Sequence, residues 1–276
     1  MTREASFRNR WWLYLLLTVA FVLVVTPFVW MVLGSVKSNA ELRSVPPTWW
    51  PENPTMQNFR DLFSRNSFGR YFFNSTVVAL TVTAGNLLFC SAVGYALAML
   101  SFRGKRLIFA LILGTLMIPG VVTFVPLFVL VANMGLVNTL PGLILPFLVS
   151  PFGVFLMRQF ILGLPRDLVE AARIDGAGEL AIFGRVILPL LGPALATLGI
   201  LTFLGSWNNF LWPLVVATGE RSYTLPVALA LISTGQNQTN YGLLLAGATV
   251  VVIPVLIVFL IFQKRFIQGI ATTGMK

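Results

Sequence analysis

A chain of 276 residues that is 57% hydrophobic and only 10% charged lacks the composition of a soluble domain, in which about 25% of residues are charged. It contains no histidine and one cysteine, Cys90, which excludes an intrachain disulfide and argues against a zinc site or a thiol enzyme. Its formal charge of +10 does not indicate nucleic acid, because the basic residues lie at the ends of apolar blocks. We therefore expect a protein embedded in membrane lipid, with no metal site and no nucleic-acid partner.

Six apolar segments follow one another along the chain, each long enough to cross a hydrocarbon core of about 30 Å as a helix. They comprise residues 11–36, 72–100, 107–132, 140–162, 190–216 and 243–262. The first is too long for the apolar region of a signal peptide, and no convincing small-residue cleavage site follows it. We expect an all-α membrane protein with six transmembrane helices, the first retained as an anchor.

Basic residues in the short connections predict the orientation, since an excess of Lys and Arg marks the cytoplasmic side. Three lie at residues 103–106, after the second segment, and two at residues 264–265, after the sixth. The connection between the third and fourth segments carries no charge. Residues 37–71 also hold basic residues, but long loops cross largely regardless of charge. We expect a multi-pass protein of a bacterial-type plasma membrane, with both termini cytoplasmic.

The connection after the fourth segment, residues 166–189, differs from the rest of this apolar chain. It holds four of the nine acidic residues: Asp167, Glu170, Asp175 and Glu179. A helix that lies on anionic lipid should be mainly basic, whereas acids and bases nearly balance here. A protein contact is therefore favoured over the alternative, an amphipathic elbow that merely joins two crossings.

Local residue preferences predict a helical elbow within this loop. Pro165 suits the first turn of a helix, and Gly176 can take a positive φ just past its end, which predicts a helix over residues 165–175. A second short helix is expected over about residues 178–188, with Pro189 turning the chain into the fifth segment. One face of the first helix collects small or mildly apolar side chains that suit a protein contact: Leu168, Ala171, Ala172 and Asp175.

The stretch EAARIDGAGELAIFGRVILP within the elbow resembles the EAA signature of ABC importer permeases. That signature runs Glu-Ala-Ala, three residues, Gly, nine residues, Ile, one residue, Leu-Pro. The matching positions are Glu170, Ala171, Ala172, Gly176, Leu188 and Pro189. Val186 stands where the family has Ile, which is a conservative difference.

Other stretches extend the resemblance over nearly the whole chain. PTMQNFRDLF, the Asn74-Ser75 entry to the second segment, SWNNFLWPLVVA and the tail FQKRFIQGIATTGMK are similar to the sugar-importer branch. Together they resemble the MalG-like second permease subunit of the maltose-type, binding-protein-dependent family.

The resemblance implies the type I ABC importer permease fold, with a cytoplasmic coupling-helix elbow that lies in a cleft on an ATPase. Its implied partners are a second permease subunit in a heterodimer, an ATPase dimer that holds ATP and Mg, and an extracytoplasmic solute-binding protein. The chain itself is then expected to bind no cofactor. The implied coupling residues are Glu170, Ala171, Ala172, Asp175, Gly176, Leu188 and Pro189.

The same resemblance implies three regions. Residues 1–70 would form the N-terminal arm, first transmembrane helix and long outer loop. Residues 71–265 would form a permease core of five helices that includes the coupling loop 165–189, and residues 266–276 a cytoplasmic tail.

The residues themselves favour a transport subunit energised by a partner. The chain has no GxxxxGK[ST] phosphate loop to hold ATP. Apart from Arg158, the apolar segments contain no Asp, Glu, Lys or Arg that could relay protons. A secondary carrier or channel for a polar solute remains the alternative, since sodium can bind through carbonyl groups. A membrane-embedded enzyme would need a cluster of catalytic groups, and we find none.

Polar residues in two segments are candidates for the translocation path, although the sequence does not identify the solute. Asn86, with Thr83 nearby, lies roughly 21 Å along the second segment at 1.5 Å per residue, and an interhelical hydrogen bond is an equal alternative role. Asn209 and its neighbours resemble sugar-contacting chemistry. Trp207, however, lies about 27 Å along the fifth segment from Pro189, which favours an interfacial aromatic belt or a binding-protein dock.

Overall fold

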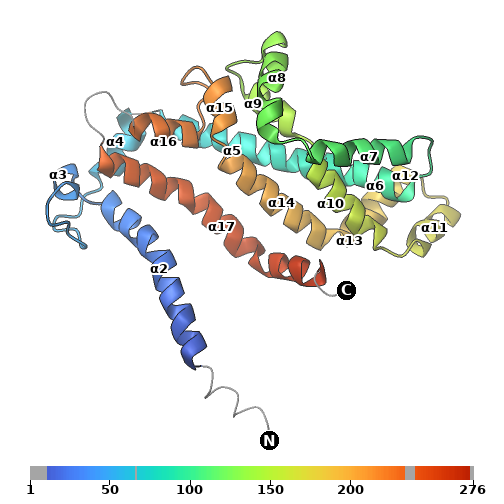
Figure 1. Ribbon diagram of the computed structural model, residues 1–276, viewed down its shortest axis with the longest axis horizontal. Helices are drawn as coiled ribbons and strands as arrows, with labels where there is room; N and C mark the ends of the chain where they lie inside the picture. The colour runs from blue at the N-terminus through green and yellow to red at the C-terminus, as the bar shows by residue number, and fades with distance from the viewer. Residues whose placement is uncertain (1–10, 66, 234–239, 274–276) are drawn as a thin grey trace, which may run out of the picture. The chain divides into compact units, whose positions relative to one another are not determined.

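The computed structural model describes residues 11–65, 67–233 and 240–273 (Figure 1). All elements in these ranges are helices. Three stretches are long and apolar enough to cross a membrane without interruption: α2 (Trp11–Ser35), the continuous helix Phe68–Met99, and the Tyr241–Gln263 part of α17 (Tyr241–Thr273). Counted as one crossing each, three bent helix pairs bring the total for the described residues to six. The all-α membrane fold is confirmed.

The chain folds into two compact units. One comprises the described residues of Met1–Phe68 and Leu229–Ile253, and the other those of Gly69–Ala228 and Pro254–Lys276. The first unit contains α2, α3 (Asn39–Leu42) and α4 (Gln57–Arg65), whereas the helices from α5 to α15 make up most of the second. The functional division at residues 70 and 265 stays a prediction.

The second crossing is a single helix with a π-helical turn in its middle. It comprises α5 (Phe68–Gly85), η1 (Asn86–Cys90) and α6 (Ser91–Met99). A Cβ on Gly85 would lie 2.6 Å from a side-chain carbon of Leu148. A Cβ on Gly94 would lie 3.0 Å from the backbone nitrogen of Arg158 in α10 (Pro151–Leu162). The two glycines therefore allow close helix packing, as small residues do in membrane bundles.

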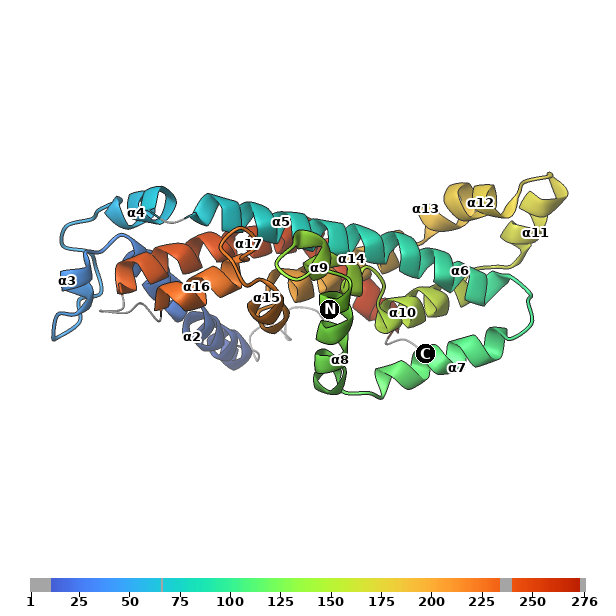
Figure 2. The same ribbon diagram turned by 90° about the horizontal axis from the view of Figure 1, so that it is seen from above.

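The third and fourth crossings are bent where their hydropathy is continuous, and a further bend separates the elbow from the fifth crossing. The bent pairs are α7 (Lys105–Leu116) with α8 (Gly120–Asn133), α9 (Leu140–Ile144) and η2 (Leu145–Phe147) with α10, and Glu179–Leu190 with α14 (Gly192–Trp207). Their bends are 105°, 41° and 81°, and Figures 1 and 2 both show α8 turning away from α7. Pro119 and Pro151 stand at the first two breaks. Proline lacks a donor and pushes the preceding residue out of the helical region, so the helix ends there.

The fifth segment also ends earlier than its hydropathy predicts. α14 stops at Trp207, and residues 208–210 separate it from a short helix, α15 (Leu211–Val216). A further helix, α16 (Leu225–Ser233), lies in the connection to the sixth segment, where the sequence predicts no element.

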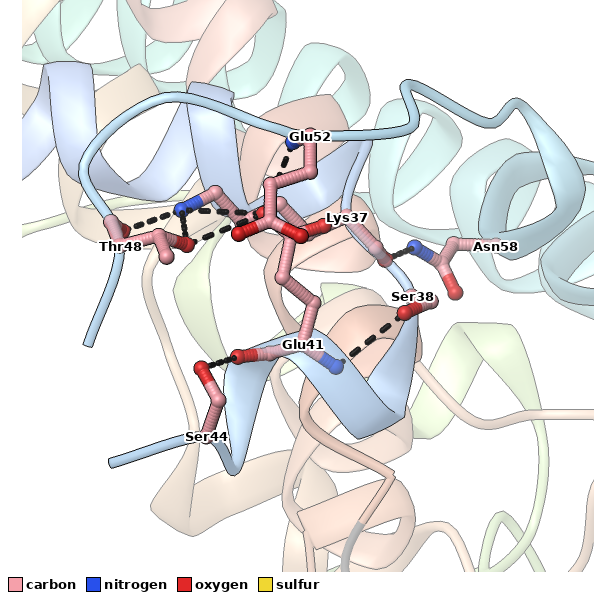
Figure 3. A network of polar contacts seen from close by, with 7 residues as sticks. All are labelled: Lys37, Ser38, Glu41, Ser44, Thr48, Glu52 and Asn58. Carbon is pink, nitrogen blue, oxygen red and sulfur yellow. Dashed lines mark hydrogen bonds and ion pairs between the residues drawn. The ribbon is translucent and has the colours of Figure 1, made fainter. Parts of the chain in front are cut away.

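Within the first unit, the connection that follows α2 folds around a buried lysine (Figure 3). Lys37 is 2% exposed, and its ammonium donates to the carbonyl oxygen and the hydroxyl of Thr48. It lies 3.7 Å from the Glu41 carboxylate and 5.1 Å from the centre of the Trp30 ring. The same carboxylate oxygen accepts hydrogen bonds from the Thr48 hydroxyl and the Glu52 backbone nitrogen. A buried ammonium requires such partners, because an unpaired buried charge is strongly destabilising.

A buried asparagine ties α4 to the end of α2 beside this network. The Asn58 side-chain amide donates to the carbonyl oxygens of Ser35 and Lys37, at 2.8 Å each. A Cβ on Gly242 would lie 2.5 Å from the Asn58 side-chain oxygen, so α17 also approaches this amide closely. The connection of residues 37–71, treated as a plain loop in the sequence, therefore has its own polar core.

Candidate functional site

The charged loop forms the helical elbow that the sequence predicts, with different internal bounds. Its elements are α11 (Asp167–Ile174), α12 (Glu179–Ala181), η3 (Ile182–Ile187) and α13 (Leu188–Leu190). In both views α11 lies beyond the ends of α6 and α10 (Figures 1 and 2). Gly176 joins the two arms with φ of 79°, a conformation that glycine adopts without the steric cost of a Cβ. The predicted role of Gly176 as the residue past the first helix is confirmed.

The turn into the fifth crossing is not where the sequence places it. Pro189 lies in α13, which continues the helix Glu179–Leu190 without a break and forms its last turn. The 81° bend follows Leu190, before α14 begins at Gly192. Pro189 is therefore part of the elbow helix, and its predicted role as the turning residue is wrong.

The elbow packs onto the second unit through one side of α11. Val169 is 2% exposed, and half-buried Ala172 packs against the same hydrophobic cluster, which includes Tyr95 and Ile182. Ala171 is exposed. The predicted contact face of the helix is thus divided: Ala172 faces the chain's own core, whereas Leu168, Ala171 and Asp175 are exposed and remain available to a partner.

The free surface of the elbow carries two large apolar side chains that the sequence analysis missed. Ile174 is 86% exposed and Leu180 is 88% exposed. Glu170, Asp175 and Gly176 are also exposed, whereas Leu188 is half-buried. Ile174 follows Ala172 by two residues, or about 200° around a helix of 3.6 residues per turn. That angle is the signal which could have placed Ile174 on the outer face once the inner face was known.

A charged hydrogen-bond triad joins the elbow to α6. The Tyr95 hydroxyl donates to one oxygen of the Glu179 carboxylate at 2.5 Å, and the Arg173 Nε donates to the other at 2.8 Å. Glu179 belongs to α12 and Arg173 to α11, so the carboxylate bridges both arms of the elbow. The hydrogen bond to Glu179 raises the pKa of Arg173. The Phe183 ring packs on Tyr95 with 5.4 Å between the ring centres.

The second unit also contains an open cavity of about 470 Å³ with a mixed lining. Aromatic and aliphatic side chains from η2, α14 and α15 form much of its wall. The polar lining residues are Ser75, Asn86, Ser150, Thr202, Ser206, Asn209 and Thr224. Thr224 is 4% exposed, and its hydroxyl oxygen has no hydrogen-bond partner among the described residues. An unpartnered buried hydroxyl beside a cavity can accept or donate to a polar ligand.

The three candidate path residues differ in their relation to this cavity. Asn86 and Asn209 line it, whereas Thr83 is not among the lining residues and donates to the Ala79 carbonyl at 2.7 Å.

Asn86 has its hydrogen-bonding groups occupied by the bundle itself. It is 1% exposed, its amide nitrogen donates to the carbonyls of Val82 and Phe147, and its oxygen accepts from the Ser150 hydroxyl at 2.7 Å. Both amide donors are used, which matches the alternative role of an interhelical link. Cys90 is fully buried nearby, as expected for a packing residue.

The indole rings of the fifth segment face inward. Trp207 is 2% exposed, packing edge-on against Phe72 and stacked on Phe203, with 5.8 and 5.7 Å between ring centres. Trp212 is equally buried, and its indole nitrogen donates to the Gly142 carbonyl at 3.1 Å. The prediction that Trp207 forms an interfacial belt or a dock is wrong, because its ring fills the interior of the unit.

Apolar crossings around a cavity with polar groups in its wall, and a charged helical elbow beyond one end of the bundle, define the class of polytopic membrane permeases. A family model described as "binding-protein-dependent transport system inner membrane component" matches residues 90–272. The chain belongs to this family and is a permease subunit of a binding-protein-dependent importer.

Curated relatives match the chain along its length. The arabinooligosaccharides transport system permease protein AraQ of Halalkalibacterium halodurans is 41% identical over 283 residues, covering 100% of both chains. The diacetylchitobiose uptake system permease protein NgcG of Streptomyces coelicolor is 37% identical over 262 residues, covering 94% of this chain and 86% of the relative.

A solved structure shares the fold. It is a bacterial ABC transporter involved in the import of the acidic polysaccharide alginate, with a TM-score of 0.86 and 23% identity, covering 96% of this chain and 99% of the other. Together with the family match, it confirms the predicted ABC importer permease fold.

Proposed function

We propose that this chain is the MalG-like second permease of an ATP-driven importer that carries an oligosaccharide or a related polar carbohydrate. Its partners are a second permease subunit, an ATPase dimer that holds ATP and Mg, and an extracytoplasmic solute-binding protein. The elbow and both termini lie on the cytoplasmic side, and the ATPase dimer docks on the elbow.

The nature of the solute is supported by the relatives and by the cavity lining. Two permeases that resemble this chain over most of their length are named for oligosaccharide systems. Hydroxyl and amide groups set among aromatic walls, as in the 470 Å³ cavity, suit the polar edges and apolar faces of a sugar ring. The unpartnered hydroxyl of Thr224 and the side chain of Asn209 are the groups best placed to contact it.

The exposed side of the elbow is the observation that carries the coupling role. Ile174 and Leu180 are more than four-fifths exposed, and exposed Glu170 and Asp175 lie on the same elbow. Exposed apolar side chains with a polar rim are typical of a protein interface. The Tyr95–Glu179–Arg173 triad would transmit a displacement of the docked ATPase from the elbow to α6, which is a helix of the permease core.

Replacing the two exposed apolar residues tests this role. We expect Ile174→Ser with Leu180→Ser to abolish co-purification of the ATPase and to stop import, because the anchors of the interface are removed. Met56→Ser is the matched control, since Met56 is 59% exposed on the connection before α4.

Two results would overturn the proposed coupling. One is full retention of the ATPase by the doubly substituted chain in correctly inserted protein. The other is solute uptake by the purified chain alone, driven by an ion gradient, which would establish the secondary carrier instead.

A further inference from the structure

A second cavity, of about 870 Å³, lies between the α6–α7 connection and the start of the elbow, within the second unit. Five basic side chains and a single carboxylate, that of Glu170, line it. The basic residues are Lys105, Arg106, Arg158, Arg166 and Arg173. Because positive charges outnumber negative ones in this cavity, an anion should bind there favourably.

Few of these positive charges are neutralised inside the chain. Arg173 pairs with Glu179 at 2.8 Å. Among the described residues, none of the other four lies in an ion pair with a carboxylate. With Arg173 paired and one further charge offset by Glu170, three positive charges remain for a ligand.

Two of the cations are fixed in place by the end of the second crossing. The Lys105 ammonium donates to the carbonyl oxygens of Ala98 and Leu100 at 3.1 and 2.7 Å. The Arg158 Nε donates to the Leu97 carbonyl at 3.2 Å, and its guanidinium lies 3.9 Å from the centre of the Phe109 ring. Arg106 and Arg166 are exposed at the cavity. Fixed and exposed cations together form a preorganised site, and guanidinium groups match phosphate oxygens in pairs.

The surroundings of the cavity indicate whether a phosphate group bound there would belong to a lipid or to a free phosphate ion. Phe102 and Leu107 line the cavity and are 42% and 65% exposed, and Ile108 and Leu111 continue the exposed apolar surface along α7. Because α7 is part of a membrane crossing, this surface meets acyl chains. Clusters of Lys and Arg at the cytoplasmic end of a crossing bind anionic lipid headgroups. A free phosphate ion would contact only the basic side chains and would make no contact with this exposed apolar surface.

We propose that this cavity binds the phosphodiester headgroup of one anionic phospholipid of the cytoplasmic leaflet, with its acyl chains along α7. The lipid bridges the start of α7 and the elbow, since Arg106 belongs to α7 and Arg166 directly precedes α11. It therefore holds the elbow near the membrane surface, where the ATPase docks. The inference rests on the proposed function only for the cytoplasmic orientation.

Lipid retention by the full chain in nanodiscs tests the proposal. Phosphatidylglycerol diluted in phosphatidylcholine is the probe, and native mass spectrometry counts the phosphatidylglycerol molecules that stay bound. We expect Arg106→Gln with Arg166→Gln to weaken retention by about 30-fold, because each basic residue near the surface contributes about 1 kcal/mol. Arg103→Gln, three residues before Arg106 and not at the cavity, should retain the lipid as the wild type does.

Three outcomes would refute it: equal retention by all variants, equal loss in Arg103→Gln, or displacement of the lipid by millimolar inorganic phosphate. Repeating the measurement on the assembled transporter adds a fourth. If the lipid is lost only when the ATPase is present, an acidic side chain of that partner fills the cavity, and the lipid assignment is wrong. None of these readouts depends on solute import, so failure of the proposed function would be seen separately.

Discussion

Removing one hydroxyl from the triad should loosen the elbow without disturbing its packing. Tyr95→Phe deletes the group that donates to Glu179 at 2.5 Å and keeps the ring that packs on Phe183. Hydrogen bonds to charged groups contribute about 1.5–3 kcal/mol. The lower end applies, because Glu179 is only half-buried and retains Arg173 as a partner. At about 1.4 kcal/mol for each factor of ten, the opening equilibrium of the elbow should rise about tenfold.

Hydrogen exchange of the elbow amides measures this opening directly. The Asp175 backbone nitrogen donates to the Ala171 carbonyl at 3.0 Å, so its amide exchanges when the end of α11 opens. We expect peptides covering residues 167–181 to exchange about tenfold faster in Tyr95→Phe than in the wild type. In the assembled transporter, more ATP should be consumed for each solute imported, because movement of the elbow reaches α6 less directly.

Tyr14→Phe provides the control, since Tyr14 is 53% exposed on α2 and loses the same atom. Exchange in Tyr95→Phe within a factor of two of the wild type would refute the triad as a mechanical link. The same conclusion follows if Tyr95→Phe and Glu179→Gln have fully additive effects, because residues that share one interaction should be non-additive.

Two further predictions concern stability. Glu41→Ala leaves the buried Lys37 ammonium without its carboxylate and should lower the free energy of unfolding by about 3 kcal/mol, at the low end for a broken buried pair. The thermal unfolding midpoint of the purified chain should fall accordingly. Glu52→Ala keeps the backbone hydrogen bond to Glu41 and should leave the midpoint unchanged. Gly85→Ala places a Cβ 2.6 Å from a neighbouring side-chain carbon and should destabilise by about 1–3 kcal/mol. Gly114→Ala, where no atom lies within 4 Å of the new Cβ, should be neutral or stabilising in the same unfolding measurement.

Features set by local composition were predictable from the sequence. The crossings follow from uninterrupted apolar runs, and the elbow from a run of charges that ends in a glycine at φ of 79°. Hydropathy did not predict the bends in the third and fourth crossings because it continues through them, although Pro119 and Pro151 marked the two breaks in the sequence. Helix α16 was not predicted because it lies in the connection between the fifth and sixth segments, where only the charged residues were used, to assign the orientation.

Features set by long-range contacts could not be predicted. Ala172 and Ala171 look alike in sequence, and only the packing of Val169 and Ala172 on the core separates the inner face from the outer one. The assignment of Asn86 to a link required its carbonyl partner on Phe147, which is 61 residues away. The Lys37 network joins residues that are separated by as many as 11 positions along an irregular connection, where no periodic pattern exists.

The π-helical turn η1 fixes how the two halves of the second crossing are phased. A π-turn holds one more residue than an α-turn, and each residue advances a helix by about 100°. Deleting one residue from Asn86–Cys90 would convert the π-turn into an ordinary α-turn that makes the same full rotation, so Gly94 would still face α10 and Tyr95 would still face Glu179, whereas a one-residue deletion within α5 would rotate α6 by about 100° about its axis. The second crossing can therefore lose one residue within this single turn and keep the orientation of its far half, so one-residue deletions should be tolerated better in η1 than in α5.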